Sequence, residues 1–341
     1  MAGGLKNNLQ IWKLARDLGL PGRDDPLTEI ISYCASRMRK LLNQFPCHSL
    51  SQLLENAATH LDTNFREIHS DDELKEVRDH FFRRGEKEFA LLDHELKPGV
   101  FAITFKRLKP KPGERQFISI IDCRGEKAFR SYFSKWHELA HLLTLTDQGR
   151  LKFCRTHSSL NKRDPEEALM EAIAGHVGFL PEMIRTHAKG PISFEKIMMV
   201  KQALCAEASV QSATIGIAKG WPMPCMLLEA SLQYKKSDRD KLHQPGFDFV
   251  SPPQADLRIV HVNHNGGASN IAKYLHKNMR IPTRSIIHRA FDGEAPVSMR
   301  ANESLGWWET KRGGYLPPIP MIVEARKQAN SVHALLVPKA T

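Results

Sequence analysis

The chain has 341 residues, of which 49 are Lys or Arg and 38 are Asp or Glu, so its net charge is +11, and 41% of its residues are hydrophobic. This composition excludes a disordered or fibrous protein, and the length predicts two or three domains. No apolar run approaches the roughly 20 residues of a membrane span, and the N-terminus lacks a basic segment followed by an apolar one, so we expect a cytoplasmic protein.

The first sixty residues have the pattern of amphipathic helices. Apolar positions recur at helical spacing over residues 9–18, 30–42 and 50–61. Two polar, proline-bearing stretches, PGRDDP and QFPCHS, separate these segments. The sequence therefore predicts three helices joined by short loops.

The period of the apolar pattern then changes. Residues 100–108 and 116–122 are short runs rich in β-branched and aromatic residues, joined by KPKPGER, and they predict two neighbouring strands. A helix is expected from near Glu126 through residue 143, and the polar segment 145–163 is expected to be irregular. Strands followed by a helix make this an α+β unit.

A second helix has a clear start signal. Asp164 suits the N-cap position, Pro165 suits the first helical position, and Glu167 stands where it can complete a capping box. This helix is expected to end near Leu180, because a proline follows.

The rest of the chain divides at a polar, proline-bearing linker over residues 235–256. Before the linker, residues 192–232 read as a helical bundle. After it, LRIVHV, the helical SNIAKYLHKNM, RSIIHRAF, PMIVEAR and VHALLVP form a strand-helix-strand series with a hairpin across KQANS. Six cysteines are scattered along the chain without CxxC pairs, which is typical of reduced thiols.

One pattern carries chemistry, the run His137-Glu138-Leu139-Ala140-His141. Residues four apart share a helix face, so the two imidazoles can bind one ion while Glu138 lies beside it. A metal ion that activates water, next to a carboxylate that accepts and returns a proton, is what metal-assisted peptide hydrolysis requires. The alternative is a surface helix with two partly exposed histidines, because the short pattern also occurs by chance.

A catalytic zinc ion needs a third protein ligand, and the helix after Asp164 supplies candidates. Glu166 and Glu167 lie in its first turn, where carboxylates are expected as caps. Glu171 lies one turn deeper, within the apolar sequence ALMEAIAGHVGFL, where an unpaired carboxylate is costly. Small residues further along the same face would let the histidine helix approach closely. We expect Glu171 as the third ligand, with Glu167 as the alternative, and zinc as the ion, with manganese as the alternative.

Three further residues are secondary candidates for a donor that stabilises the transition state, namely His176, His157 and Tyr132. His176 lies on the other side of its predicted helix, where a hydrogen-bonded core histidine is the competing interpretation. His157 follows Cys154 at a CxxH spacing, and we interpret both as loop residues.

These segments resemble a known family. RSYFSKWHELAHLL, preceded by QFISIID and followed by EALMEAIAGHVGFLP, is similar to the ImmA/IrrE metallopeptidases, whose HELGH-type helix is followed by a Glu-Ala helix that ends at a proline. The resemblance covers about residues 51–184. It implies a zincin-like fold in which His137, His141 and Glu171 bind zinc and Glu138 is the general base.

The order of segments also resembles the radiation-response branch of that family, in which a helix-turn-helix-like bundle and a GAF-like sensor domain follow the peptidase. We therefore expect an α+β protein with four parts. They are an N-terminal helical segment (1–50), a mainly helical metallopeptidase domain with a small sheet (51–190), a helix-turn-helix-like bundle (191–240) and a C-terminal α/β GAF-like domain (245–341).

The function that the resemblance implies is zinc-dependent cleavage of a helix-turn-helix repressor in a stress or mobile-element response, with a protein substrate and no membrane. The alternative is a non-catalytic DNA-binding or regulatory protein on a peptidase-like scaffold, and Glu138 argues against it, because a scaffold needs no base. The positive charge permits non-specific nucleic-acid contact. No Arg, Asn or Gln follows Gln211 in the bundle's second helix to read bases, which favours a packing role.

Overall fold

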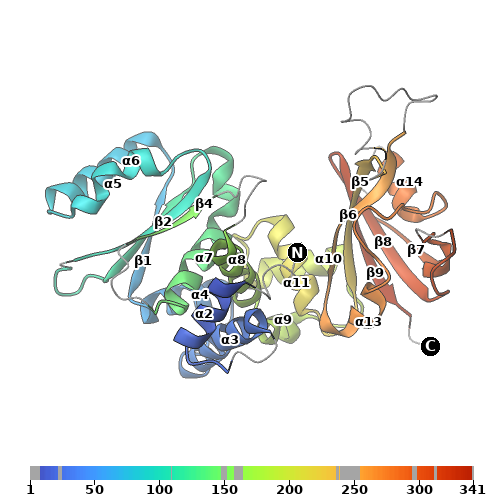
Figure 1. Ribbon diagram of the computed structural model, residues 1–341, viewed down its shortest axis with the longest axis horizontal. Helices are drawn as coiled ribbons and strands as arrows, with labels where there is room; N and C mark the ends of the chain where they lie inside the picture. The colour runs from blue at the N-terminus through green and yellow to red at the C-terminus, as the bar shows by residue number, and fades with distance from the viewer. Residues whose placement is uncertain are drawn as a thin grey trace. The chain divides into compact units, whose positions relative to one another are not determined.

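The structure, a computed structural model, describes residues 8–21, 25–108, 110–146, 152–156, 164–235, 238, 254–293, 298–310 and 313–339. The chain in Figure 1 divides into two compact units, Met1–Met183 with Lys201–Gly216, and Ile184–Val200 with Ile217–Thr341. Each unit contains one β-sheet. No helix among the described residues is long and apolar enough to cross a membrane.

The N-terminal helices lie where the sequence predicts them. They are α2 (Leu9–Asp17), α3 (Pro26–Gln44) and α4 (Leu50–His60). The side chains of Asn8, Asp25 and Ser49 accept hydrogen bonds from backbone N–H groups in the respective first turns. These caps satisfy N–H groups that have no partner within the helix.

The sheet of the first unit has the strand order β1-β3-β2-β4. Its strands are β1 (Thr63–Ile68), β2 (Val100–Lys106), β3 (Phe117–Asp122) and β4 (Lys152–Thr156). β1 is parallel to β3, and the other neighbours are antiparallel. The predicted strands correspond to β2 and β3, which are central. Sequence analysis missed β1 and β4, because these edge strands lack a continuous apolar run, and β4 corrects the expectation of an irregular segment.

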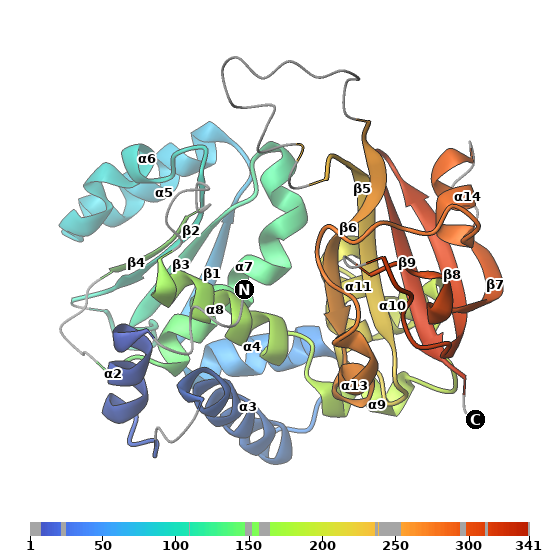
Figure 2. The ribbon, with the colours of Figure 1, turned by 45° about the vertical axis from the view of Figure 1, so that its right-hand side comes forward.

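The two faces of this sheet meet different helices because side chains alternate along each strand. Ile103, Phe105 and other apolar residues pack under α5 (Asp71–Arg83), a 3₁₀ helix (Lys87–Leu91) and α6 (Leu92–Glu95). Helix α7 (Ser131–Leu143) packs against the sheet on the side to which Thr104 points, and Figure 2 shows α7 beside the sheet. The segment from Gly125 to Arg130, expected as the start of this helix, is 3₁₀.

Helices α7 and α8 (Pro165–Val177) run antiparallel in close contact. At one end the Tyr132 hydroxyl donates a hydrogen bond of 2.6 Å to the Gly178 carbonyl, and a Cβ at Gly178 would lie 2.8 Å from Cδ1 of Trp136. At the other end Thr144 Oγ1 lies 3.6 Å from the sulfur of Met170. The expected close approach of the two helices is confirmed.

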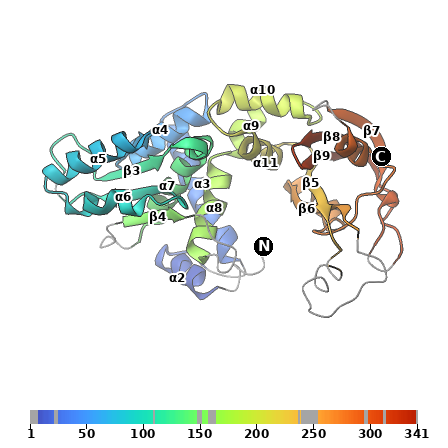
Figure 3. The ribbon, with the colours of Figure 1, turned by 90° about the horizontal axis from the view of Figure 1, so that it is seen from above.

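Three helices follow, α9 (Pro181–His187), α10 (Phe194–Leu204) and α11 (Val210–Gly220), and all three are labelled in Figure 3. Within α11, Ala213 is fully buried, and a Cβ at Gly216 would lie 2.1 Å from the Phe179 ring. Such burial fits the packing role that the sequence favours for this helix.

The expectation of helix over residues 192–232 is wrong for Met226–Gln233, which forms strand β5. Leu, Met, Ala and Glu favour helix locally, but pairing with a strand on each side outweighs this preference. The sheet of the second unit has the order β6-β5-β9-β8-β7 and is antiparallel. The other strands are β6 (Asp256–His264), β7 (Met299–Ser304), β8 (Pro320–Gln328) and β9 (Ser331–Pro338).

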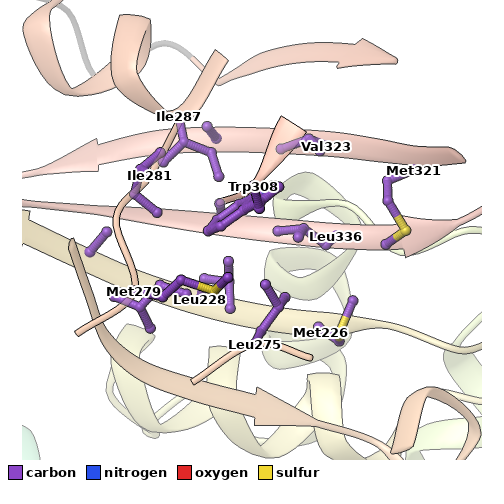
Figure 4. Close-up of a cluster of buried hydrophobic side chains, with 14 of the residues drawn as sticks. Met226, Leu228, Leu275, Met279, Ile281, Ile287, Trp308, Met321, Val323 and Leu336 are labelled. Atoms are coloured by element: carbon purple, nitrogen blue, oxygen red, sulfur yellow. The ribbon is translucent and has the colours of Figure 1, made fainter. Parts of the chain in front are cut away.

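The second unit therefore begins before the predicted boundary at residue 245. The hairpin predicted across KQANS is confirmed by the pairing of Gln328 with Ser331. The helix predicted over SNIAKYLHKNM is short, since only α13 (Ser269–Ala272) is α-helical there, whereas α14 (Ile286–Asp292) is a regular helix. Figure 4 shows Trp308, 1% exposed, in the middle of the apolar cluster that fills this unit.

The contact at Gly178 predicts unequal effects of alanine at two glycines of one region. Gly178→Ala should destabilise the protein by about 1–3 kcal/mol, because the new methyl group would overlap the buried Trp136 ring. The control is Gly175→Ala within α8, where a Cβ would have only Phe133 at 4.0 Å as a neighbour. Urea unfolding measures both variants. Equal stability of the two would contradict the described contact.

Candidate metal centre

Helix α7 holds the three residues of the sequence pattern in the interior of the first unit. His137 and Glu138 have no exposed surface, and His141 is 2% exposed. A surface helix with two partly exposed histidines, the alternative in the sequence analysis, is therefore wrong. Charged and imidazole groups in such a place need close partners, because burial without them is costly.

The partner of the two histidines is Glu167, in the first turn of α8. Its Oε2 lies 3.2 Å from Nε2 of His137, and its Oε1 lies 3.3 Å from Nε2 of His141. Ligand atoms of His137, His141 and Glu167 all lie within 4.8 Å of one another. The Glu167 carboxylate thus faces the Nε2 atom of each imidazole ring.

These separations fit a shared metal ion. Zinc binds His and carboxylate ligands at about 2.0–2.1 Å, so neighbouring ligand atoms of a tetrahedral site lie about 3.3–3.4 Å apart. Charge-assisted hydrogen bonds between nitrogen and a carboxylate are shorter, about 2.7–2.9 Å. The distances of 3.2 and 3.3 Å lie nearer the zinc geometry. A fourth position is required for water or substrate.

The expected third ligand, Glu171, does not belong to this group, and the alternative, Glu167, does. The two glutamates lie one turn apart on one helix, and the antiparallel packing of α7 and α8 brings the first turn of α8 to the histidines. The cap is supplied without Glu167, because Asp164 accepts the hydrogen bond from the Glu166 N–H. Glu171 is half-buried, further along the helix.

Glu138 is held by the sheet rather than by α8. Its Oε2 accepts a hydrogen bond of 2.6 Å from the Thr104 hydroxyl on β2. Thr104 and Ser119 are paired across β2 and β3, and their hydroxyl oxygens lie 2.6 Å apart. Sequence analysis missed both residues. Each is a hydroxyl-bearing residue within a stretch of strand that is otherwise apolar and buried, and a single polar residue in such a stretch is the signal that could have identified it.

The buried cluster perturbs the pKa values of its members. Burial disfavours the protonated form of His141, but the carboxylates of Glu166, Glu167 and Glu138 outweigh this and raise its pKa to about 9. Burial also disfavours the ionised form of Glu167, but His137 and His141 lower its pKa to about 2. Nδ1 of His141 faces Oε1 of Glu166 at 3.6 Å, on the side where a second carboxylate commonly orients a metal-bound imidazole.

A cavity of about 200 Å³ adjoins this centre. It is lined by Gln10, Ile11, Lys13, Leu14 and Asp17 of α2, and by His141, Thr144, Leu145, Thr146 and Glu166. Helix α2 therefore forms one wall of the space beside His141.

The secondary candidates lie apart from this arrangement or outside the described residues. The Tyr132 hydroxyl is engaged by the Gly178 carbonyl, so Tyr132 joins the two helices there. His176 is half-buried in the last turn of α8, at the opposite end from Glu167. His157 lies outside the described residues, as does the side chain of Cys154.

No protein-family model matches the chain, and no curated protein matches its sequence.

The two glutamates can be separated by metal binding. Glu167→Ala should lower zinc affinity by about 10²-fold or more, because one of three protein ligands is lost, whereas Glu171→Ala should leave it within about twofold. Competition with a chromophoric chelator measures both affinities. Loss of zinc in Glu171→Ala alone would contradict the described geometry.

The raised pKa of His141 predicts that metal binding releases protons. Near neutral pH the metal-free chain carries a proton on His141, and a bound cation displaces it. Zinc affinity should therefore rise as the pH rises toward about 9. Conversely, protonation of His141 stabilises the metal-free fold below its ordinary pKa of 6.5, and this contribution is lost as the pH rises through about 9. Calorimetry in two buffers of different ionisation enthalpy counts the protons, and a buffer-independent binding enthalpy would contradict the prediction.

Proposed function

We propose that the chain is a zinc-dependent metalloendopeptidase of the ImmA/IrrE type that acts in the cytoplasm. The observation that supports this most strongly is that the buried His137 and His141 face the partly exposed Glu167, with the buried Glu138 beside the histidines on α7. A surface ion pair would not require the burial of two imidazoles and a carboxylate in one place.

The proposed metal ligands are the Nε2 atoms of His137 and His141 and the carboxylate of Glu167, with manganese as the alternative ion. When bound, zinc polarises a peptide carbonyl and makes a water molecule acidic. Glu138 accepts the proton of the attacking water at Oε1 and passes it to the leaving amine. The Thr104 hydroxyl holds Oε2 and so fixes the orientation of the carboxylate.

The substrate class rests on the resemblance to enzymes that cleave a helix-turn-helix repressor in a stress or mobile-element response. The cavity beside His141 supports a peptide substrate, because Ile11 and Leu14 offer apolar contacts and Lys13 and Asp17 offer polar ones. In this proposal α2 contributes to the selection of the residues that flank the cleaved bond.

The second unit is proposed to be the GAF-like sensor domain. This proposal is supported by architecture alone. The unit has a five-stranded antiparallel sheet, an apolar cluster around Trp308, and helices α13 and α14 packed against the sheet. By their position in the sequence, α10 and α11 are proposed to correspond to the helix-turn-helix-like bundle.

A non-catalytic DNA-binding or regulatory protein remains the alternative function. The Thr104 hydroxyl bond to Glu138 argues against it, since a scaffold has no use for a buried carboxylate oriented beside two imidazoles. The buried positions of α11 also leave few side chains to enter a DNA groove.

Glu138→Gln separates catalysis from metal binding. The substitution keeps the side-chain size and the hydrogen bond from Thr104 but removes the proton acceptor, so peptide cleavage should fall by about 10²–10⁴-fold while zinc content is unchanged. Cleavage is measured on a peptide library by mass spectrometry and then on purified helix-turn-helix repressors. Glu171→Gln is the matched control and should cleave like the wild type. Equal cleavage by Glu138→Gln and the control would rule out Glu138 as the base.

A further inference from the structure

A second set of metal-ligand side chains lies at the carboxyl ends of β1 and β3. The two strands are parallel, with Glu67 paired to Ile121, and the Cys123 N–H donates to the Ile68 carbonyl at 2.8 Å. Because side chains alternate, this register brings Glu67, His69 and Cys123 to the same face. Their ligand atoms all lie within 4.8 Å of one another.

The carboxylate of Glu67 is oriented by the start of α7. The Ser131 hydroxyl donates to its Oε1 at 2.5 Å, and the Lys135 ammonium lies 2.9 Å from the same oxygen. The other oxygen, Oε2, faces Nε2 of His69 at 3.6 Å. That distance is too long for a hydrogen bond, so the two side chains face a shared space rather than bind each other directly.

The cluster is closed on one side and open on the other. Cys123 is 4% exposed, whereas the side chains of Glu67 and His69 are 34% and 58% exposed. A groove of about 580 Å³ runs past Glu67, His69 and Lys135. Glu67 and His69 are therefore reached from the groove, and the buried Cys123 sulfur lies within 4.8 Å of their ligand atoms.

The chemistry of the donors selects the class of ion. A thiolate, an imidazole and a carboxylate together favour zinc and similar thiophilic cations over magnesium or calcium. With Cys123 ionised, the thiolate and Glu67 carry two negative charges against the single positive charge of Lys135, which leaves a net attraction for a divalent cation. Asp122 is not part of the set, because Arg124 and Lys127 bind its carboxylate at 2.8 and 2.6 Å.

We propose that Glu67, His69 and Cys123 form a second binding site for a thiophilic divalent cation of the zinc class, distinct from the His137, His141 and Glu167 centre. On binding, the S–H bond of Cys123 breaks, its proton passes to solvent and a sulfur–metal bond forms. The ion would tie the turn between β1 and α5 to the end of β3.

Cobalt(II) tests the proposal because it substitutes for zinc and shows an intense near-ultraviolet band only when a thiolate binds it. The full-length wild type, stripped of metal, should bind about two cobalt equivalents and develop this band, while Cys123→Ser and His69→Ala should bind about one and lose it. His141→Ala should also bind about one equivalent but keep the band. Cys225→Ser, which changes a buried cysteine outside both groups, should behave like the wild type.

These measurements test the second cation site independently of the proposed peptidase function. A wild type without a sulfur–cobalt band, or a band that survives in both Cys123→Ser and His69→Ala, would overturn the second site. If Cys123→Ser fails to fold, His69→Ala decides, because the exposed His69 side chain can be shortened without disturbing the core. If the His137 centre does not bind metal, the wild type should still show the sulfur–cobalt band but bind only about one equivalent of cobalt. His141→Ala should then bind as much cobalt as the wild type.

Discussion

The contact between Gly178 and Trp136 determines how closely α7 and α8 approach, and the candidate centre depends on that approach. A side chain at position 178 would meet the buried indole ring, whereas glycine lets the helices touch. With the hydroxyl of Tyr132 bonded to the Gly178 carbonyl, this end of the helix pair is fixed. The first turn of α8 then lies against the imidazoles of α7, and the Glu167 carboxylate faces both of them.

The price in free energy of this arrangement explains other features of the first unit. Two imidazoles and the Glu138 carboxylate are buried, and Glu167 is partly buried beside them, where unpartnered charge is strongly unfavourable. Glu167 is stabilised by the histidines, and Glu138 by a hydroxyl from the sheet. At position 104 an apolar residue could not donate a hydrogen bond to Glu138, and the Ser119 hydroxyl lies beside that of Thr104. Their presence in apolar strands reflects the needs of the centre rather than those of the core.

Much of this could be predicted from the sequence, and the rest needed tertiary structure. Helical period places His137 and His141 on one face, and cap residues locate the start of α8, because both are local properties. The choice between Glu167 and Glu171 is not local, since residues four apart share a face and only the axial position of α8 against α7 separates them. Strand β5 shows the same limit, because residues with high helix propensity take the extended form only when neighbouring strands pair with them.

Helix α7 takes part in both clusters of metal-ligand side chains, the buried one around His137 and the more exposed one around Glu67. Ser131 and Lys135 bind Glu67 in the open cluster, while His137, two residues after Lys135, belongs to the buried one. Exposure decides how each cluster exchanges ions. A cation held by the exposed His69 side chain has direct access to solvent, whereas the histidines of the other centre are 0–2% exposed and their ion would exchange through the cavity beside His141. The open cluster would thus exchange its ion more readily than the buried centre.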